Sequence, residues 1–266
     1  NRNEFYRRAW EKGDIDLMLA FGTWAGQDLA VDVHHVPTVV CSTSNAIQSG
    51  IIASAADSGL DHVHARIDPD RYARQVRVFH DIVGFRRLGV VYQDTVVGRS
   101  YAGLDQIIPV ADELGIELVS CTIPFEKGDV EMAEQGILAC HEKLATEIDA
   151  MYITIHMGVN EHSIKKLLEP LHAHNIPTFA MGTHYEVRSG ALMSMAQMDF
   201  DYAGRFYART VAKILNGVRP RDISQILEDP HEVSVNLKTA KRIGFRIPLD
   251  VLSSAAIVVS EEGELE

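Results

Sequence analysis

The chain has 266 residues, and 46% of them are hydrophobic, which is enough to bury the core of one large domain or of two lobes. Its 25 basic and 37 acidic residues give a formal net charge of −12, which repels nucleic acids and anionic membrane surfaces. We therefore expect no nucleic-acid partner.

The first 85 residues alternate between short apolar segments and helical patterns. The segments IDLMLAFG, VPTVVCST and HVHARI are short, apolar and bounded by turn residues, so each is predicted to be a buried strand. Helices are predicted at Thr23 to Val33, Ser44 to Ile52 and Asp70 to Val83. This order is typical of a sheet whose strands are linked by helices.

A strand, a helix and a second strand follow between Arg87 and Pro124. RRLGVVYQ and IELVSCTIP are the two apolar runs, and a helical pattern from Val97 to Leu114 lies between them and ends at Gly115. Because the helix carries the chain back over the sheet, the two strands are predicted to be parallel. Ligands of such sheets bind beyond the carboxyl ends of the strands.

The alternation continues to the end of the chain. Helices are predicted at Asp129 to Ile148, Glu161 to His174 and Phe200 to Leu215, and strands at AMYITIH, IPTFAMG, GALMSMA and VSVNL. The pattern predicts an α/β fold of two Rossmann-like lobes with mostly parallel sheets. We expect lobe 1 to comprise residues 1–85 with about 195–266, and lobe 2 to comprise residues 86–194.

Sequence motifs of common enzyme classes are missing. The chain contains no GxGxxG, GxxxxGK[ST] or HExxH. The segment from Gly98 to Gly103 is one residue too long for a GxSxG nucleophile elbow and lies inside a helical pattern, so Ser100 is interpreted as a helix residue and not as a nucleophile. We expect no catalytic residue.

The histidines and cysteines do not form metal motifs. His62 and His64, and His172 and His174, are spaced two residues apart, and no third ligand stands at motif spacing. We therefore expect no metal and no cofactor. The three cysteines, Cys41, Cys121 and Cys140, each lie within an apolar pattern and are expected to be unpaired buried thiols.

Five polar segments follow the predicted strands and are the candidate ligand-binding loops. Their hydroxyl and amide groups could cap helices or bind a ligand carboxylate, and aromatic residues nearby offer surface to a ring. A single such loop favours capping, but five of them favour a binding cleft. The candidate residues are Thr23 and Trp24, Ser42, Thr43, Ser44 and Asn45, Tyr92, Asp94 and Tyr101, His156 and Asn160, and Thr183 and His184.

Several of these segments resemble one protein family. RRLGVVYQD, ADELGIELVSCTIP, DAMYITIH, HNIPTFAMG and the segment from Gly190 to Pro248 are similar to the substrate-binding proteins of ABC importers, whose best-known members bind aromatic amino acids. The resemblance implies the type I periplasmic binding fold, with two lobes joined by a hinge. It also implies a monomer in the periplasm or at the cell surface, such as a lipoprotein, that delivers a small solute to a membrane permease.

The chain departs from the family pattern in two places. The family opens with a strand, a helix and a strand before the position of Asp16, so lobe 1 is expected to lack its N-terminal portion. The acidic residue and the Thr-Asp pair that contact an amino group are replaced by Thr183-His184 and His156-Met157. We consider two alternative functions. The first is the ligand-sensing ectodomain of a receptor, and the second is a hydrolase or transferase that acts through Ser100 or His156.

Overall fold

The computed structural model describes residues 4, 8, 11–124, 129–196, 200–228, 232–261 and 263–265. Contacts between residues divide the chain into two compact units. Unit 1 comprises Asn1–Pro69 and Asp199–Asp229, and unit 2 comprises Asp70–Met198 and Pro230–Glu266. Within the described residues, no helix is both long and apolar enough to cross a bilayer.

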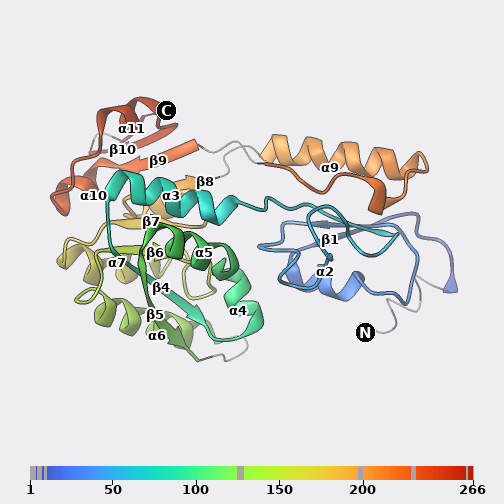
Figure 1. The fold of residues 1–266 in the computed structure, drawn as a ribbon, viewed down its shortest axis with the longest axis horizontal. Coiled ribbons are helices and arrows are strands. Elements are labelled where there is room, and N and C mark those ends of the chain that lie inside the picture. Colours follow the sequence, from blue (N-terminus) through green and yellow to red (C-terminus); the bar gives the residue numbers. More distant parts are fainter. Residues whose placement is uncertain are drawn as a thin grey trace. The chain divides into compact units, whose positions relative to one another are not determined.

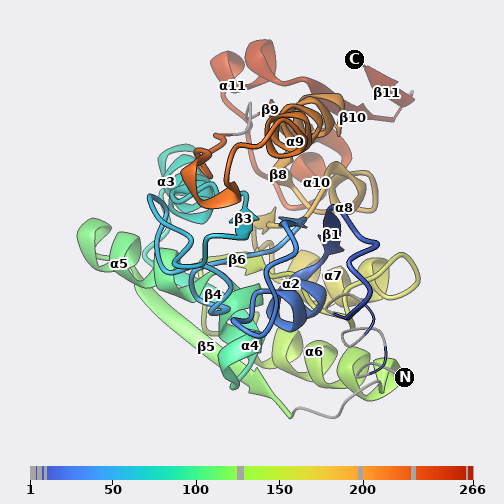
Figure 2. The same cartoon turned by 90° about the vertical axis from the view of Figure 1, so that its right-hand side faces the viewer.

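Unit 1 is built on a parallel sheet in the order β1-β2-β3. Its elements are β1 (Met18–Phe21), α2 (Thr23–Leu29), β2 (Thr38–Cys41), β3 (Val63–Ala65), α9 (Phe200–Leu215) and the 3-10 turn η1 (Pro220–Asp222). Neighbouring residues of β2 point to opposite faces, so Val40 packs with Leu29 of α2 while Val39 and Cys41 pack with Ile214 of α9. The two helices therefore cover opposite faces of this sheet (Figures 1 and 2).

Unit 2 contains a larger sheet, whose strands in the described residues have the order β11-β10-β9-β8-β7-β6-β4-β5. The strands are β4 (Arg87–Gln93), β5 (Glu117–Ile123), β6 (Ala150–Ile153), β7 (Thr178–Ala180), β8 (Met193–Ala196), β9 (Glu232–Asn236), β10 (Ile257–Ser260) and β11 (Gly263–Leu265). The helices are α3 (Arg71–Val83), α4 (Val96–Tyr101), α5 (Leu104–Leu114), α6 (Val130–Leu144), α7 (Ile164–Ala173), α8 (His184–Arg188), α10 (Leu237–Arg242) and α11 (Leu249–Ser254). The parallel pairing predicted for β4 and β5 is confirmed.

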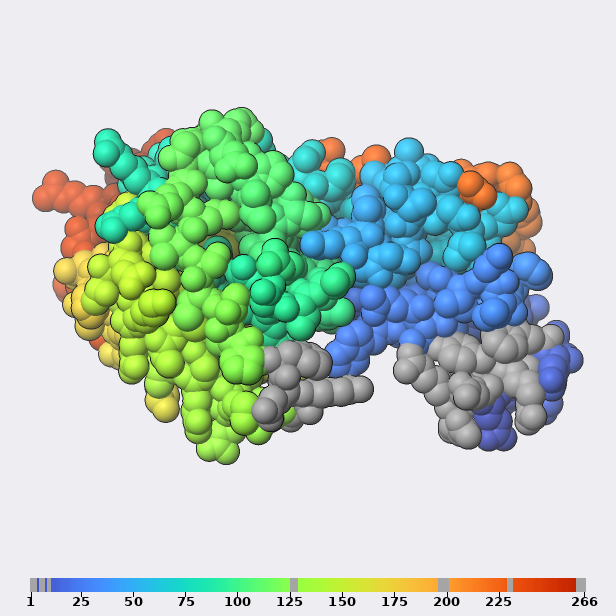
Figure 3. Space-filling view, turned by 60° about the horizontal axis from the view of Figure 1, so that its bottom comes forward, coloured from blue at the N-terminus to red at the C-terminus, as the bar shows by residue number. Residues whose placement is uncertain are grey.

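Helices cover both faces of the unit 2 sheet. Val90 of β4 packs in a cluster with side chains of α3 and α5, whereas its neighbour Val91 packs with side chains of α6 and α7. Figure 2 shows α3 and α5 on one side of the strands and α6 and α7 on the other, and residues of α4 and α5, green in Figure 3, reach the surface. A strand buried on both faces reads as a continuous apolar run, which is why RRLGVVYQ was recognisable.

The expected lobe boundaries, residues 1–85 with about 195–266 and residues 86–194, differ from these units at two places. Helix α3 belongs to unit 2, because Tyr72, Val76 and Phe79 are fully buried in the cluster that also holds Leu88 of β4. The C-terminal strands also belong to unit 2, because β9 pairs antiparallel with β8 and β10 pairs parallel with β9.

Two helix predictions were wrong in detail. Residues 44–52 form turns instead of a helix. The Asn45 carboxamide caps the first turn by accepting the N–H groups of Ile47 and Gln48 at 3.1 and 3.0 Å, but the chain turns away at Gly50, which has a φ of +70°. The helix predicted from Val97 to Leu114 is divided into α4 and α5 at Gly103, which has a φ of +65°. A Cβ atom there would lie 2.5 Å from the Tyr72 ring, so this turn requires glycine.

The expectation of three unpaired cysteines was also wrong. Cys121 of β5 and Cys140 of α6 form a disulfide, with their Cα atoms 5.7 Å apart, and Cys41 is a free, buried thiol. Both cysteines of the pair follow the apolar pattern because α6 packs directly on β5, and that packing brings the two side chains together.

Candidate ligand-binding site

Three of the candidate loops lie at one edge of the unit 2 sheet. Strands β4, β6 and β7 are parallel to one another, so their carboxyl ends meet at the same edge. Tyr92 lies near the end of β4 itself, and the segments that follow the three strands contain Asp94, His156 and Asn160, Thr183, and His184 at the start of α8. The structure thus brings these residues to the edge where α/β sheets bind ligands.

His156, after β6, has an unused hydrogen-bonding atom. Its Nδ1 accepts the N–H of Gly158 at 3.1 Å, so in the neutral ring the proton resides on Nε2. Nε2 is buried and has no partner among the described residues. Burial lowers the pKa of His156, which keeps the ring neutral at pH 7. His156 is therefore a candidate donor whose Nε2 proton is not used by any described residue.

The backbone around His156 depends on Gly158. A Cβ atom at this position would lie 2.8 Å from backbone atoms of Ala133 and Glu134 in α6, so only glycine allows the loop to approach the helix this closely. The amide of Asn160 adds a second tie to α6 through a hydrogen bond of 2.7 Å to the Glu134 carboxylate. Its carbonyl oxygen accepts the N–H groups of the next turn. Asn160 thus positions the loop.

The polar side chains of the loop after β4 form contacts with residues of the same segment. The Asp94 carboxylate forms an ion pair with Arg99 at 2.7 Å, and the Arg99 guanidinium lies 5.6 Å from the centre of the Tyr92 ring. Tyr92 is buried and belongs to the core cluster of α3 and α5, while Tyr101, at the end of α4, is half-buried. The Thr95 hydroxyl caps α4 by accepting the N–H of Gly98 at 2.9 Å.

The loop after β7 contains a capping box. The Thr183 hydroxyl donates to Glu186 at 2.7 Å and accepts the N–H of Tyr185 at 3.2 Å, and Glu186 also accepts the Thr183 N–H. The sequence left capping and ligand binding open for Thr183, and in this structure the hydroxyl caps α8. The partner Glu186 was missed, although Thr-x-x-Glu is the spacing of a capping box. His184, the next residue, has a buried Nδ1 without a partner among the described residues.

Unit 1 presents aromatic surface at the corresponding edge of its own sheet. The side chains of Phe21 and Trp24 are 67% and 53% exposed at the end of β1 and the start of α2, whereas Thr23 between them is buried. The turn is joined to β2 by the Gly22 N–H, which donates to the Cys41 carbonyl at 2.9 Å. Phe21 is not among the candidates predicted from the sequence. In β1, buried and exposed residues alternate, and Phe21 is an apolar residue on the exposed face.

The loop after β2 follows at the same edge of unit 1. Ser42 has a φ of +58°, a conformation that L-residues rarely adopt, and its N–H donates to the Tyr207 hydroxyl of α9 at 3.3 Å. Thr43 and Ser44 are half-buried and Asn45 is buried. Strained residues of this kind concentrate at binding sites, but here the strain is also explained by the contact with α9.

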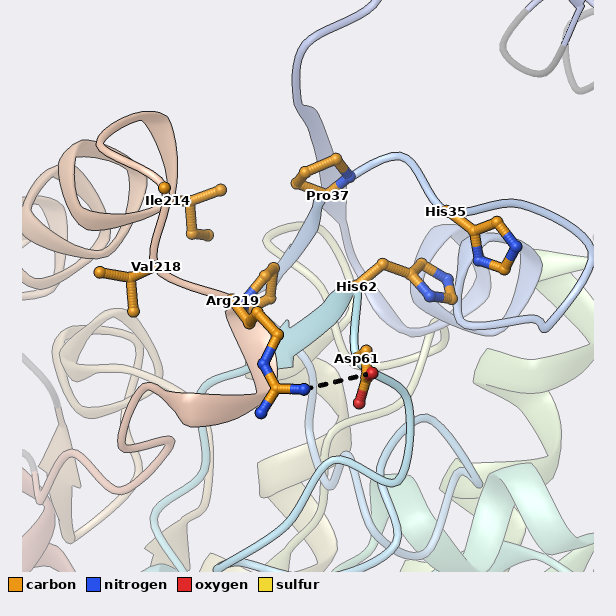
Figure 4. A pocket seen from close by; sticks show the side chains of 9 residues that line it. His35, Pro37, Asp61, His62, Ile214, Val218 and Arg219 are labelled. Atoms are coloured by element: carbon orange, nitrogen blue, oxygen red, sulfur yellow. Dashed lines mark hydrogen bonds and ion pairs between the residues drawn. The ribbon is translucent and has the colours of Figure 1, made fainter.

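Unit 1 has a further pocket, of about 420 Å³, at the opposite edge of its sheet (Figure 4). Pro37 and His62, which line it, precede β2 and β3, so it lies at the amino ends of these strands. Its charged groups are matched, because Arg219 forms two hydrogen bonds with Asp222, at 2.8 and 3.0 Å, and an ion pair with Asp61 at 3.4 Å. No motif in the sequence indicates this pocket.

No metal centre is evident in the part of the chain that the structure describes. Within these residues, no three or more histidine, cysteine, aspartate or glutamate side chains are grouped so that they could hold an ion. The arrangement is one of hydrogen-bonding and aromatic groups at strand ends, which suits capture of a small organic molecule.

Comparisons with known proteins extend this description. A family model described as ABC transporter substrate binding protein matches residues 7–259. No curated protein matches the chain in sequence.

Three solved structures are similar in fold. A conserved domain protein from Vibrio cholerae has a TM-score of 0.75 and 20% identity, with 97% of this chain and 84% of that chain covered. An ABC domain in complex with L-Trp from Streptococcus pneumonia has a TM-score of 0.73 and 18% identity, with 92% of this chain and 81% of that chain covered. The ligand-free, open structure of a substrate binding protein with adhesive properties from Clostridium difficile has a TM-score of 0.69 and 20% identity. The match covers 97% of this chain and 82% of that chain. These likenesses establish the α/β fold of type I periplasmic binding proteins.

Proposed function

Because this chain belongs to the ABC transporter substrate binding protein family, we propose that it captures a small organic solute outside the cytoplasm and delivers it to the permease of an ABC importer. The observation that carries this proposal is the family match over residues 7–259. Members of this family bind and release their ligand unchanged, which agrees with the absence of enzyme motifs from the sequence.

Within each unit, the geometry of the loops at the strand ends supports binding of a small molecule. In unit 2 the donor Nε2 of His156 is buried and has no hydrogen bond with a described residue, and in unit 1 Phe21 and Trp24 are exposed. A bound solute favours the conformation of the protein that binds it more tightly, and the permease would recognise that conformation.

The disulfide supports a location outside the cytoplasm. Disulfides persist in the periplasm and at cell surfaces and are rare in the reducing cytoplasm. The Cys121–Cys140 bond joins β5 to α6 within one unit, so it is part of the fold and not a link between chains. The disulfide therefore supports a location outside the cytoplasm independently of the family match.

We propose a carboxylate with an aromatic or aliphatic body as the solute. A neutral histidine donor suits a carboxylate oxygen, and the exposed rings of Phe21 and Trp24 suit an apolar body. The similar structure from Streptococcus pneumonia contains L-Trp, an amino acid of this description.

A thermal-shift screen tests the proposed function. A solute held at about 100 times its dissociation constant is expected to stabilise the native protein by about 2.7 kcal/mol, which raises the melting temperature by about 5 to 10 °C. The panel would contain aromatic and aliphatic amino acids, other small carboxylates and nucleosides. Absence of any shift, together with absence of any small molecule released from the purified protein by denaturation, would contradict the proposal.

Single substitutions then test the site. His156→Ala is expected to weaken binding of the solute found in the screen by about 10- to 100-fold, since a hydrogen bond to a charged group contributes about 1.5–3 kcal/mol. His162→Ala is the matched control, because His162 is exposed on the same loop and only its backbone N–H is engaged. Calorimetric titration of both variants gives the comparison, and equal affinities would remove His156 from the site.

A further inference from the structure

Unit 2 has a second pocket, of about 280 Å³, that the solute-binding loops do not use. It lies between α7, α10 and the turn that leads from α8 into β8, which Figure 2 shows close together. Asn236, at the end of β9, lines it. Because β9 is antiparallel to β8, this is the edge of the sheet opposite the loops after β4, β6 and β7.

The walls of this pocket are strongly basic. Four cationic side chains line it, Lys165, Arg188, Lys238 and Arg242, against the single carboxylate of Glu169. Arg242 holds that carboxylate through two hydrogen bonds, of 3.1 and 2.7 Å. In a chain with a net charge of −12, such a concentration of positive charge is unusual and marks a site for an anion.

Two of these cations have no ion pair within the described part of the chain. The ammonium groups of Lys165 and Lys238 form no ion pair with any described residue, and Glu261, whose charge interacts with Lys238, is bonded to Lys241 at 2.8 Å. Each lysine ammonium group is a compact positive charge with three N–H groups that donate hydrogen bonds, and such groups commonly bind oxyanions.

His172, which also lines the pocket, has a buried ring nitrogen without a partner among the described residues. His172 is 6% exposed, and its Nε2 donates to the Gly190 carbonyl at 3.0 Å, so Nδ1 is the unprotonated nitrogen of the neutral ring. Nδ1 is buried and has no hydrogen bond with any described residue. A protonated Nδ1 could donate to an anion in the pocket.

We propose that this pocket binds a small multivalent oxyanion, of the phosphate or polycarboxylate type, through Lys165, Lys238 and His172. Binding takes up a proton at His172, because the anion offsets the positive charge of Arg242 beside the ring. Burial and then Arg242 lower the pKa of His172 in the empty pocket, and Glu169 opposes that effect. The site is separate from the solute loops, so it does not depend on the proposed solute.

Calorimetric titration with pyrophosphate and with citrate tests the site on the whole chain. The wild-type protein is expected to bind one anion per chain, at least threefold more tightly at pH 6 than at pH 7.5. The double variant K165Q/K238Q is expected to bind at least tenfold more weakly. The control K143Q/K166Q removes the same charge from exposed lysines of α6 and α7 outside the pocket and is expected to stay within twofold of wild type.

Each possible result has a distinct meaning for the proposed site. No binding by the wild-type protein of either free anion or of phosphatidylglycerol vesicles would overturn the proposal, and so would equal weakening by both double variants, since that shows diffuse charge only. Binding of vesicles alone, lost in K165Q/K238Q, would identify the oxyanion as a lipid phosphate. A His172→Gln variant that loses the pH dependence but keeps its melting temperature would support proton uptake at His172, and unchanged pH dependence would remove it.

Discussion

Replacement of Cys121 and Cys140 by alanine is expected to lower the free energy of unfolding of unit 2 by about 3 kcal/mol. The bond joins residues 19 positions apart, and a cross-link of this span removes that much loop entropy from the unfolded chain. Urea unfolding of the oxidised wild type and of the double variant measures the difference. Loss of far less than 1 kcal/mol would show that α6 packing alone holds β5.

Reductant provides the control for this comparison. Dithiothreitol should destabilise the wild-type protein by a similar amount and leave the double variant unchanged. A thiol count makes a second check, because Cys41 is the one cysteine left unpaired and burial raises its pKa to about 11. Without reductant, one thiol should react after denaturation, and three should react after reduction. Three reactive thiols without reductant would contradict the disulfide.

Acidification from pH 7 to pH 4 is expected to remove about 3 kcal/mol of stability through His141 alone. Burial lowers the pKa of this histidine from 6.5 to about 4, and its Nδ1 donates to the Leu167 carbonyl at 2.8 Å. Between these two pKa values the unfolded chain binds a proton that the folded chain does not, so stability is complete above pH 6.5 and falls as the pH approaches 4.

The pH dependence of His141→Gln tests this assignment. Glutamine cannot titrate, so the fall in unfolding free energy between pH 7 and pH 4 should be smaller by about 3 kcal/mol than in the wild type. The exposed His162 serves as the control, and His162→Gln should retain the wild-type slope. Burial also lowers the pKa values of His34, His62 and His64, so some acid sensitivity should remain in both variants. An unchanged slope in His141→Gln would contradict the assignment.

The fold was predictable wherever burial leaves a periodic signal. RRLGVVYQ and AMYITIH are apolar on both faces, and both are central strands of the unit 2 sheet. The break at Gly103 was missed because the apolar positions on either side keep the helical spacing, and only the contact with Tyr72 shows why the chain turns. The pairing of β9 with β8 depends on contacts between distant segments, which local patterns do not contain.

The candidate site was predictable as a set of loops but not as a set of roles. Parallel strands guarantee that Asp94, His156 and Thr183 share an edge, whichever atoms they use. Their roles depend on neighbours that the sequence does not identify. Arg99 pairs with Asp94 and Glu186 bonds to Thr183, whereas Nε2 of His156 has no partner among the described residues. The disulfide is a similar case, since two cysteines in apolar patterns look the same whether paired or free.

The division into units has a consequence for folding during synthesis, because unit 1 is assembled from two segments that are far apart in the chain. Unit 1 takes its sheet from the first 69 residues but its covering helix, α9, from residues 200–215. While unit 2 strands β4 to β8 are being synthesised, the face of β2 that carries Val39 and Cys41 lacks the cover of Ile214 and Ile223. An emerging chain with such an exposed apolar face is prone to misassociation, so slow translation between residues 70 and 215, or a chaperone bound there, should affect the yield of folded protein.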